Sequence, residues 1–244
     1  MKTVILKNVI DFDKLTKNSI QLSEKVFLKN KQIIKLFFTR GTISSGFINP
    51  YSERLIKNSL KLKKLGVHSI KVTHHLIFEF NKRMSGVIYN KLDGKTIREI
   101  CKERDLTVAE IKYLAKFTST LHNEGIYFKA MHLGNLVLNK KIYLIDIAKI
   151  NFYPWPLWFN TRIRAFKRIF KYKDDLKNFG DKNLNIFLTY YCQFSKIGPI
   201  KQHIFLFLIK KLADKKLVKT INKFKIFFLV LAGFFILDFD WSIN

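Results

Sequence analysis

The sequence predicts an α+β protein of two lobes, a small β-rich N-lobe with one helix and a mainly helical C-lobe. Its 244 residues, 48% of them hydrophobic, are enough to bury a core. Strand-like composition dominates the first part of the chain, and helical periodicity dominates much of the rest. Four prolines, ten glycines and no low-complexity linker argue against a string of separate domains. We therefore predict the two lobes at residues 1–91 and 92–244.

The predicted N-lobe consists of strands with a single helix set between the second and the third. Strand-like composition is found near 20–28, 31–39, 69–80 and 85–91. The helix is predicted over 52–64, where the apolar residues have helical spacing, and it ends near Gly66. No glycine-rich loop joins the first two strands, because residues 18–25 contain no glycine.

The C-lobe begins after a turn at Asp93-Gly94. Two capping boxes follow, at 96–99 and 107–110, and each predicts the start of a helix. The second helix is well supported because its apolar residues share one face: Val108, Ile111, Leu114, Ala115, Thr118 and Leu121. It ends at Gly125, and we expect His122 and Glu124 at its end to be structural.

The segment after this helix contains the most informative pattern of the chain. Two short apolar strands, 135–138 and 142–145, flank the polar turn 139–141, so a hairpin returns Asp146 to the side of Asn135. Amide and carboxylate oxygens are ligands that Mg²⁺ prefers, and phosphoryl transfer depends on metal and positioned charges more than on covalent chemistry. Asn135 and Asp146 are therefore candidate metal ligands.

The loop Phe128-Lys129-Ala130-Met131-His132-Leu133-Gly134-Asn135 resembles the catalytic loop of the protein-kinase-like superfamily, His-x-Asp-x-x-x-x-Asn. It is most similar to the branch of bacterial lipopolysaccharide-core kinases and toluene-tolerance proteins. In this alignment Phe128 takes the place of the first His, and Ala130 takes the place of the catalytic Asp. His132 is the second His of that branch, and Asn135 is the Asn. The resemblance implies a bilobal kinase-like fold that uses ATP and Mg²⁺.

The resemblance also implies roles for residues of the N-lobe. Lys35, in the second predicted strand, would hold the nucleotide phosphates, and Glu53, at the start of the helix, would pair with it. Asn90 and Leu92 would form the hinge beside adenine. From the residues alone, Lys35 is equally an edge-strand lysine that favours solubility, and Glu53 an acidic first-turn residue favoured by the helix dipole.

Ala130 puts catalysis in question, because the missing aspartate would orient the attacking hydroxyl and accept its proton. General-base catalysis contributes about 100- to 10,000-fold, so its loss does not by itself exclude activity. His132 is the nearby group that titrates near neutral pH. It either contacts the transferred phosphate or accepts a proton, or it packs inside the loop and bonds to backbone. We list Asp146 and His132 as candidate catalytic residues.

The chain beyond Asp146 combines aromatic and basic residues. Trp155 and Trp158 precede a basic amphipathic segment, 159–173, whose apolar stripe includes Ile163 and Phe166. This segment either lies at a membrane interface or packs its apolar stripe on the C-lobe and leaves the basic face in solvent. A second apolar segment, 226–237, is shorter than the roughly 20 residues of a spanning helix, so we expect a buried helix rather than an anchor.

The formal net charge of +27 predicts attraction to polyanions: nucleic acid, an anionic membrane or a phosphorylated glycolipid. The alternative is that a codon pool rich in A and T produced the many lysines. No nucleic-acid recognition motif is present, so we regard nucleic acid as an unlikely partner. The apolar run of residues 1–8 is too short for a secretory signal, and the two cysteines form no motif. These features predict a cytoplasmic protein with reduced thiols, attached at most peripherally to the inner face of the membrane.

Our leading hypothesis is a kinase-like phosphotransferase of lipopolysaccharide or glycolipid biosynthesis, which transfers phosphate from Mg-ATP to an anionic glycolipid precursor. The alternative is a catalytically silent pseudokinase that binds nucleotide or a partner enzyme as a scaffold. The sequence does not decide between the enzyme and the scaffold.

Overall fold

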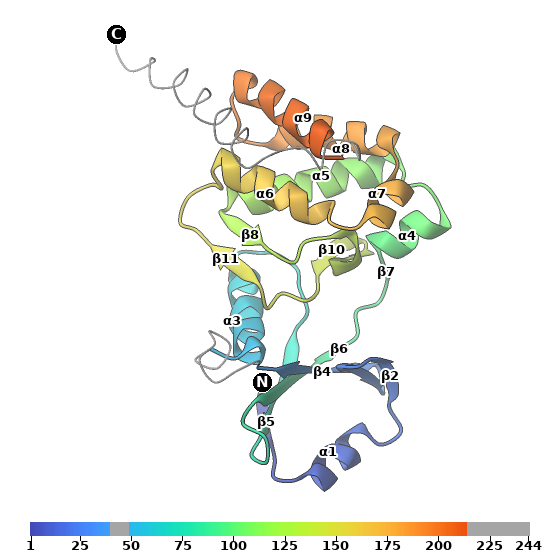
Figure 1. Ribbon diagram of the computed structural model, residues 1–244, viewed down its shortest axis with the longest axis vertical. Coiled ribbons are helices and arrows are strands. Elements are labelled where there is room, and N and C mark those ends of the chain that lie inside the picture. Colours follow the sequence, from blue (N-terminus) through green and yellow to red (C-terminus); the bar gives the residue numbers. More distant parts are fainter. Residues whose placement is uncertain (40–48, 214–244) are drawn as a thin grey trace. The chain divides into compact units, whose positions relative to one another are not determined.

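The structure is a computed structural model that describes residues 1–39 and 49–213 (Figure 1). The chain forms two compact units, Met1–Ile197 and Gly198–Asn244. The second unit contributes one described helix, α9 (Pro199–Ala213). Within the described ranges, no helix has the length and apolar character needed to cross a membrane. The predicted apolar segment 226–237 lies outside the described residues.

A six-stranded sheet forms most of the N-lobe, in the order β1-β5-β6-β4-β3-β2. Its strands are β1 (Lys2–Leu6), β2 (Ile20–Ser23), β3 (Val26–Lys29), β4 (Gln32–Phe38), β5 (Val72–Phe78) and β6 (Met84–Asn90). The edge strand β1 pairs in parallel with β5, and the other neighbours are antiparallel. The predicted strand at 20–28 is in fact a hairpin, because Glu24 and Lys25 form a tight turn between β2 and β3.

Among the described residues of the N-lobe, two helices accompany this sheet, one more than the sequence predicts. The predicted helix is α3 (Tyr51–Lys64), and the additional one is α1 (Val9–Thr16). Phe12 and Leu15 of α1 pack against a sheet cluster that includes Leu76. Sequence reasoning missed α1 because the helix is short and none of its residues is fully buried, so it lacks a clear apolar stripe.

The C-lobe is mainly helical. Its helices in this unit are α4 (Ile97–Glu103), α5 (Val108–Asn123), α6 (Phe159–Ile169), α7 (Lys173–Phe179) and α8 (Asp181–Phe194). Both predicted capping boxes are confirmed, at the starts of α4 and α5. The predicted face of α5 is buried except for Val108, which is exposed in the first turn. The two-lobed α+β fold is thus confirmed, and the lobe boundary at residue 91 stays a prediction.

Short strands frame the loop between α5 and α6. They are β7 (Lys95–Thr96), β8 (Ile126–Phe128), β9 (Leu136–Asn139), β10 (Lys141–Leu144) and β11 (Ile150–Phe152), with a 3₁₀ turn, η1, at Leu133–Asn135. The predicted hairpin is confirmed as β9–β10, with Lys140 at φ 53° in the turn. The end of β10 is fixed from the side of the N-lobe, because Leu144 exchanges backbone hydrogen bonds with His68 and Ile70. The residue that follows this strand pair is therefore held in a defined place.

Candidate active site

The hairpin brings Asp146 back to Asn135, as the spacing predicts. The N–H of Ile145 donates to the carbonyl oxygen of Asn135 at 3.1 Å, so the residue next to Asp146 is bonded directly to Asn135. Asp146 itself has φ 54°, in the left-handed region that non-glycine residues rarely adopt. Such strained backbone concentrates at functional sites, where surrounding structure maintains it.

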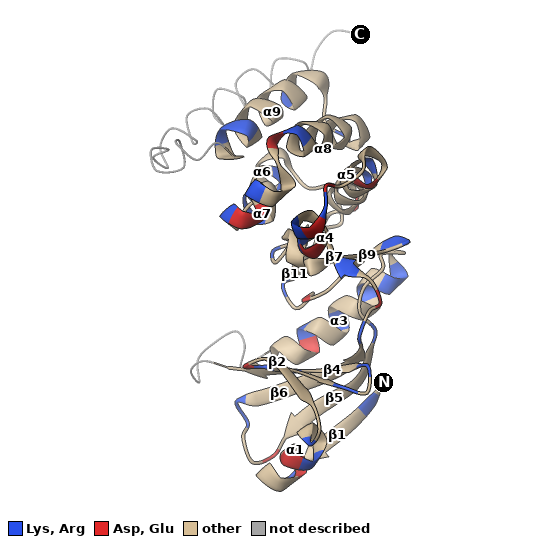
Figure 2. Cartoon of the chain, turned by 90° about the vertical axis from the view of Figure 1, so that its right-hand side faces the viewer, with Lys and Arg blue, Asp and Glu red and all other residues tan. Residues whose placement is uncertain are grey.

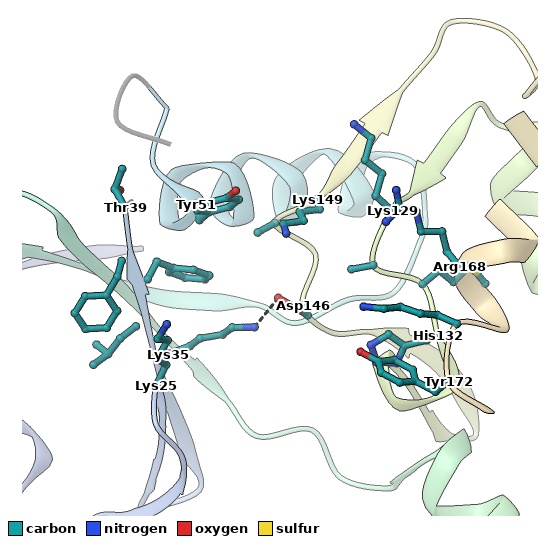
Figure 3. A pocket seen from close by; sticks show the side chains of 17 residues that line it. Lys25, Lys35, Thr39, Tyr51, Lys129, His132, Asp146, Lys149, Arg168 and Tyr172 are labelled. Atoms are coloured by element: carbon teal, nitrogen blue, oxygen red, sulfur yellow. Dashed lines mark hydrogen bonds and ion pairs between the residues drawn. The ribbon is translucent and has the colours of Figure 1, made fainter. Parts of the chain in front are cut away.

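Asp146 meets Lys35 across the cleft between the lobes. Lys35 lies in the middle of β4, and its Nζ is 2.5 Å from Oδ1 of Asp146 (Figure 3). The lysine side chain is only 17% exposed, whereas the aspartate is 43% exposed. Two residues that are 111 positions apart in the chain thus form the central ion pair of the cleft.

The ion pair expected between Lys35 and Glu53 is not formed; Glu53 instead pairs with Lys57, one turn along α3 at 3.3 Å. Helix α3 reaches the segment that follows Asp146 through another side chain. Asn58 donates its Nδ2–H to the carbonyl oxygen of Ile147, the residue after Asp146, at 2.7 Å. The helix is therefore coupled to Asp146 by an amide rather than by a glutamate.

Asn135 is buried and oriented by the loop that it terminates. Its Nδ2 donates to the carbonyl oxygen of Ala130 at 2.7 Å, which leaves Oδ1 as the atom available to a ligand. Together with the carboxylate of Asp146, this oxygen suits Mg²⁺, which is bound by few protein groups beside substrate phosphates. Within residues 1–39 and 49–213, no cluster of three or more His, Cys, Asp or Glu residues could hold a metal by itself. Asn135 and Asp146 therefore fit Mg²⁺ that arrives with a nucleotide.

His132 is fixed by partners that determine its protonation. Its Nδ1 accepts the N–H of Gly134 at 3.2 Å and lies 3.3 Å from a guanidinium nitrogen of Arg98. Both partners are donors, so Nδ1 carries no proton and the proton of the neutral ring is on Nε2. Burial, reinforced by the charge of Arg98, lowers the pKa of His132. His132 is thus a neutral hydrogen-bond donor rather than a proton acceptor at neutral pH.

Arg98 is itself held by an acid from another helix. Its guanidinium makes a bidentate ion pair with Asp175 of α7, at 2.5 and 2.8 Å, and this carboxylate is buried. Tyr172 packs edge-on against the His132 ring at 4.9 Å and lies under the Arg98 guanidinium. A methyl group added at Gly134 would come within 2.8 Å of Arg98. The loop 128–135 therefore rests on a cluster that sequence reasoning missed.

A cavity of about 620 Å³ opens beside the Lys35–Asp146 pair and is lined by both lobes (Figure 3). Among the described residues that line it, Asp146 is the sole carboxylate. The basic residues of the lining are Lys25, Lys35, Lys129, Lys149, Arg168 and Lys171. This excess of positive charge suits a polyanionic ligand.

Lys25 occupies the turn between β2 and β3, where the glycine-rich loop was sought. The carbonyl oxygen of Lys25 accepts the N–H of Leu36 at 2.8 Å, which anchors the turn on β4, and its side chain lines the cavity. Lys25 therefore places a side-chain cation at the cavity, in the position where a glycine-rich loop would place backbone amides. Lys25 could have been found only with the strand pairing, which places the turn next to Lys35.

Asn90 and Leu92 are not part of the described lining of the cavity, and neither are Glu53 and Asn135. Asn90 ends β6 opposite Gln32, and Leu92 follows it in the chain connection to the C-lobe. Their assignment to the adenine hinge stays a prediction.

The basic segment 159–173 does not expose its apolar stripe to solvent. Ile163, Phe166 and Ile169 of α6 are buried in the C-lobe, whereas the opposite face is exposed and basic. Of the two alternatives, the apolar stripe packs on the C-lobe, and binding of the segment at a membrane interface stays a prediction. His122 is also structural, as expected, because it is buried and its Nδ1 is hydrogen-bonded to the hydroxyl of Tyr191 at 2.8 Å.

The two lobes and the lysine–aspartate pair between them define a protein-kinase-like fold. The solved structure of WaaP in complex with acyl carrier protein matches 85% of this chain and 96% of the WaaP chain, with a TM-score of 0.55 and 12% identity. This likeness confirms the predicted fold. No protein-family model matches the sequence, and no curated protein is similar to it.

Two further solved structures are similar at lower scores. The match to WbdD bound to the kinase inhibitor LY294002 covers 81% of this chain and 45% of the WbdD chain, with a TM-score of 0.48 and 17% identity. The kinase PK-1 of Cydia pomonella granulovirus matches 79% of each chain, with a TM-score of 0.41 and 16% identity.

Proposed function

We propose that this protein is a kinase-like phosphotransferase that transfers phosphate from Mg-ATP to an anionic glycolipid precursor of lipopolysaccharide. The observation that carries the proposal is the Lys35–Asp146 pair at the mouth of a cationic cavity bounded by the catalytic-like loop. The resemblance of that loop to lipopolysaccharide-core kinases supports the pathway. We place the protein in the cytoplasm, at the inner face of the membrane.

In this proposal the chain supplies positioning and charge. Lys35 and Lys25 bind phosphate oxygens, and Lys35 exchanges its bond to Asp146 for them. Asn135 and Asp146 would hold Mg²⁺, and the ion would neutralise phosphate charge. His132 donates its Nε2–H to an oxygen of the ligand, because Nδ1 is already occupied. Lys129, Lys149, Arg168 and Lys171 remain for the anionic acceptor.

Ala130 favours a second candidate, a pseudokinase that binds Mg-ATP without transferring phosphate. No described residue that lines the cavity offers a carboxylate apart from Asp146, and His132 is held as a donor. The attacking hydroxyl therefore has no evident protein base. Phosphoryl transfer through a loose transition state needs little proton abstraction at the start, so this absence lowers the expected rate rather than excluding transfer.

The decisive experiment is a calorimetric titration of the full chain with ATP, with and without Mg²⁺, for the parent and for Asp146→Asn. We expect magnesium-dependent binding that the variant loses, with little change in stability, because Asp146 is half-exposed and contributes no core packing. Asp13→Asn, an exposed acid on α1, is the matched control. Equal magnesium-dependent binding by parent and Asp146→Asn would refute the site. Binding without ADP formation in the presence of lipopolysaccharide acceptors would favour the pseudokinase.

A further inference from the structure

We infer that the exposed pair Trp155–Trp158 and the basic face of α6 form one docking surface for an anionic lipid bilayer. The two indole rings stack 6.4 Å apart at 26°, and their residues are 51% and 70% exposed. Soluble proteins rarely leave neighbouring large aromatic residues in water without a partner. Tryptophan is favoured where an apolar environment meets a wet one, as at the surface of a bilayer.

The loop that carries the two tryptophans is rigidly anchored. Leu157, between them, is buried; its N–H donates to the carbonyl oxygen of His122 at 2.7 Å, and its own carbonyl accepts from Nε of Arg162 at 2.8 Å. The loop also lies on Gly125, where an added Cβ would be 2.4 Å from the carbonyl oxygen of Trp155. The indole rings are therefore presented by fixed backbone and are not the ends of a loose segment. This arrangement lowers the entropy lost on docking.

The helix that follows adds a continuous charged stripe. Its exposed residues include Arg164, Lys167 and Arg168, which lie three or four positions apart on the helix, and the exposed Lys171 follows just after the helix end. Figure 2 draws the basic residues of the chain in blue and labels α6. No acidic residue lies within 159–173; the first acids follow at Asp174, which is exposed, and Asp175, which is buried and paired with Arg98. Such a stripe is complementary to the negative surface of an anionic leaflet.

The same helix connects the tryptophan pair to the cavity. Arg168 and Lys171 line the cavity, and Trp158 immediately precedes the helix. Ten residues of helix correspond to about 15 Å, a length comparable to that of a lipid head group carrying several sugars. On the basis of the proposed function, docking at this surface would present a lipid-linked acceptor to the cavity from the membrane side. The docking itself does not depend on phosphotransfer.

Vesicle binding tests the inference with full-length protein. The probes are phosphatidylcholine vesicles with and without phosphatidylglycerol, and the readout is cosedimentation at low and raised salt. We expect binding to the anionic vesicles alone, weakened by salt. Arg164→Gln/Lys167→Gln should weaken it roughly 25-fold, about fivefold per charge, because each basic residue near an anionic surface contributes similarly. Trp155→Ala/Trp158→Ala should weaken it by a comparable or larger factor.

Matched controls separate this surface from general properties of the chain. Lys63→Gln/Lys64→Gln removes two exposed charges from α3, and Leu60→Ala shortens an exposed apolar side chain of the same helix. Neither should change binding. A Trp241→Phe protein retains the two tryptophans of the surface as its fluorophores. Its emission should shift to the blue on anionic vesicles.

Several outcomes would overturn the inference. The parent protein would fail to bind anionic vesicles at low salt, or one of the two surface variants would bind as tightly as the parent. A tryptophan emission that does not shift in the bound state would have the same consequence. Retained vesicle binding together with absent Mg-ATP binding would refute the proposed function but support the docking surface. Circular dichroism and urea unfolding confirm that each variant is folded.

Discussion

His122 is expected to make this protein less stable in mild acid. The ring is buried at the end of α5, where its Nδ1 is hydrogen-bonded to the hydroxyl of Tyr191, and that hydroxyl oxygen accepts from Arg162 at 3.1 Å. Burial, with a contribution from the Arg162 charge, lowers the pKa of His122 to about 3, from a usual value near 6.5. The unfolded chain thus takes up a proton as the pH falls below about 6.5, and the folded chain does not.

The magnitude follows from this difference. The contribution of His122 to the free energy of unfolding is fully present above the pKa of the unfolded chain. Below pH 6.5 the free energy of unfolding decreases by about 1.4 kcal/mol for each pH unit, until the pKa of the folded chain is reached. At about pH 5 the loss from His122 is about 2 kcal/mol. Its size there depends on the unfolded pKa, because the folded ring does not titrate at that pH.

The assay is urea unfolding at about pH 7.5 and pH 5, for the parent and for His122→Asn. Asparagine can accept the Tyr191 hydroxyl through Oδ1 but cannot be protonated, so the variant should lose about 2 kcal/mol less than the parent between the two pH values. His75 and His132, whose pKa values are also lowered by burial, act in the same direction in both proteins and cancel in the comparison. His203→Asn, at an exposed histidine of α9, is the control. Equal losses in parent and His122→Asn would refute the reasoning.

Three further outcomes are expected. Lys25→Ala should weaken Mg-ATP binding about tenfold in a calorimetric titration, whereas Lys64→Ala should not; equal affinities would remove Lys25 from the phosphate site. Gly134→Ala should destabilise the protein by about 1–3 kcal/mol in urea, since its Cβ meets the clamped Arg98, and an unchanged midpoint would show that Arg98 relocates freely. Ala130→Asp should raise any slow ATP hydrolysis about 100-fold if only the base is missing; no change would favour the pseudokinase.

The sequence by itself determined features that depend on short stretches of chain. The capping boxes of α4 and α5 and the β9–β10 hairpin were predictable because helix starts and tight turns are set by a few neighbouring residues. The return of Asp146 to Asn135 followed from that hairpin. The kinase-like fold was implied by the resemblance of the loop 128–135 to a known family, with which the order of the predicted strands and helices agreed.

Only the tertiary structure decided which distant groups meet. Lys35 pairs with Asp146 rather than Glu53 because the lysine side chain of β4 reaches the segment after β10, and α3 reaches that segment through Asn58. The tautomer of His132 depends on Arg98, whose position depends in turn on Asp175. The apolar stripe of α6 could not be assigned to core or membrane from its period, because both environments select the same spacing. Packing against the C-lobe buries that stripe and leaves the basic face, with the two tryptophans before it, as the exposed surface of the helix.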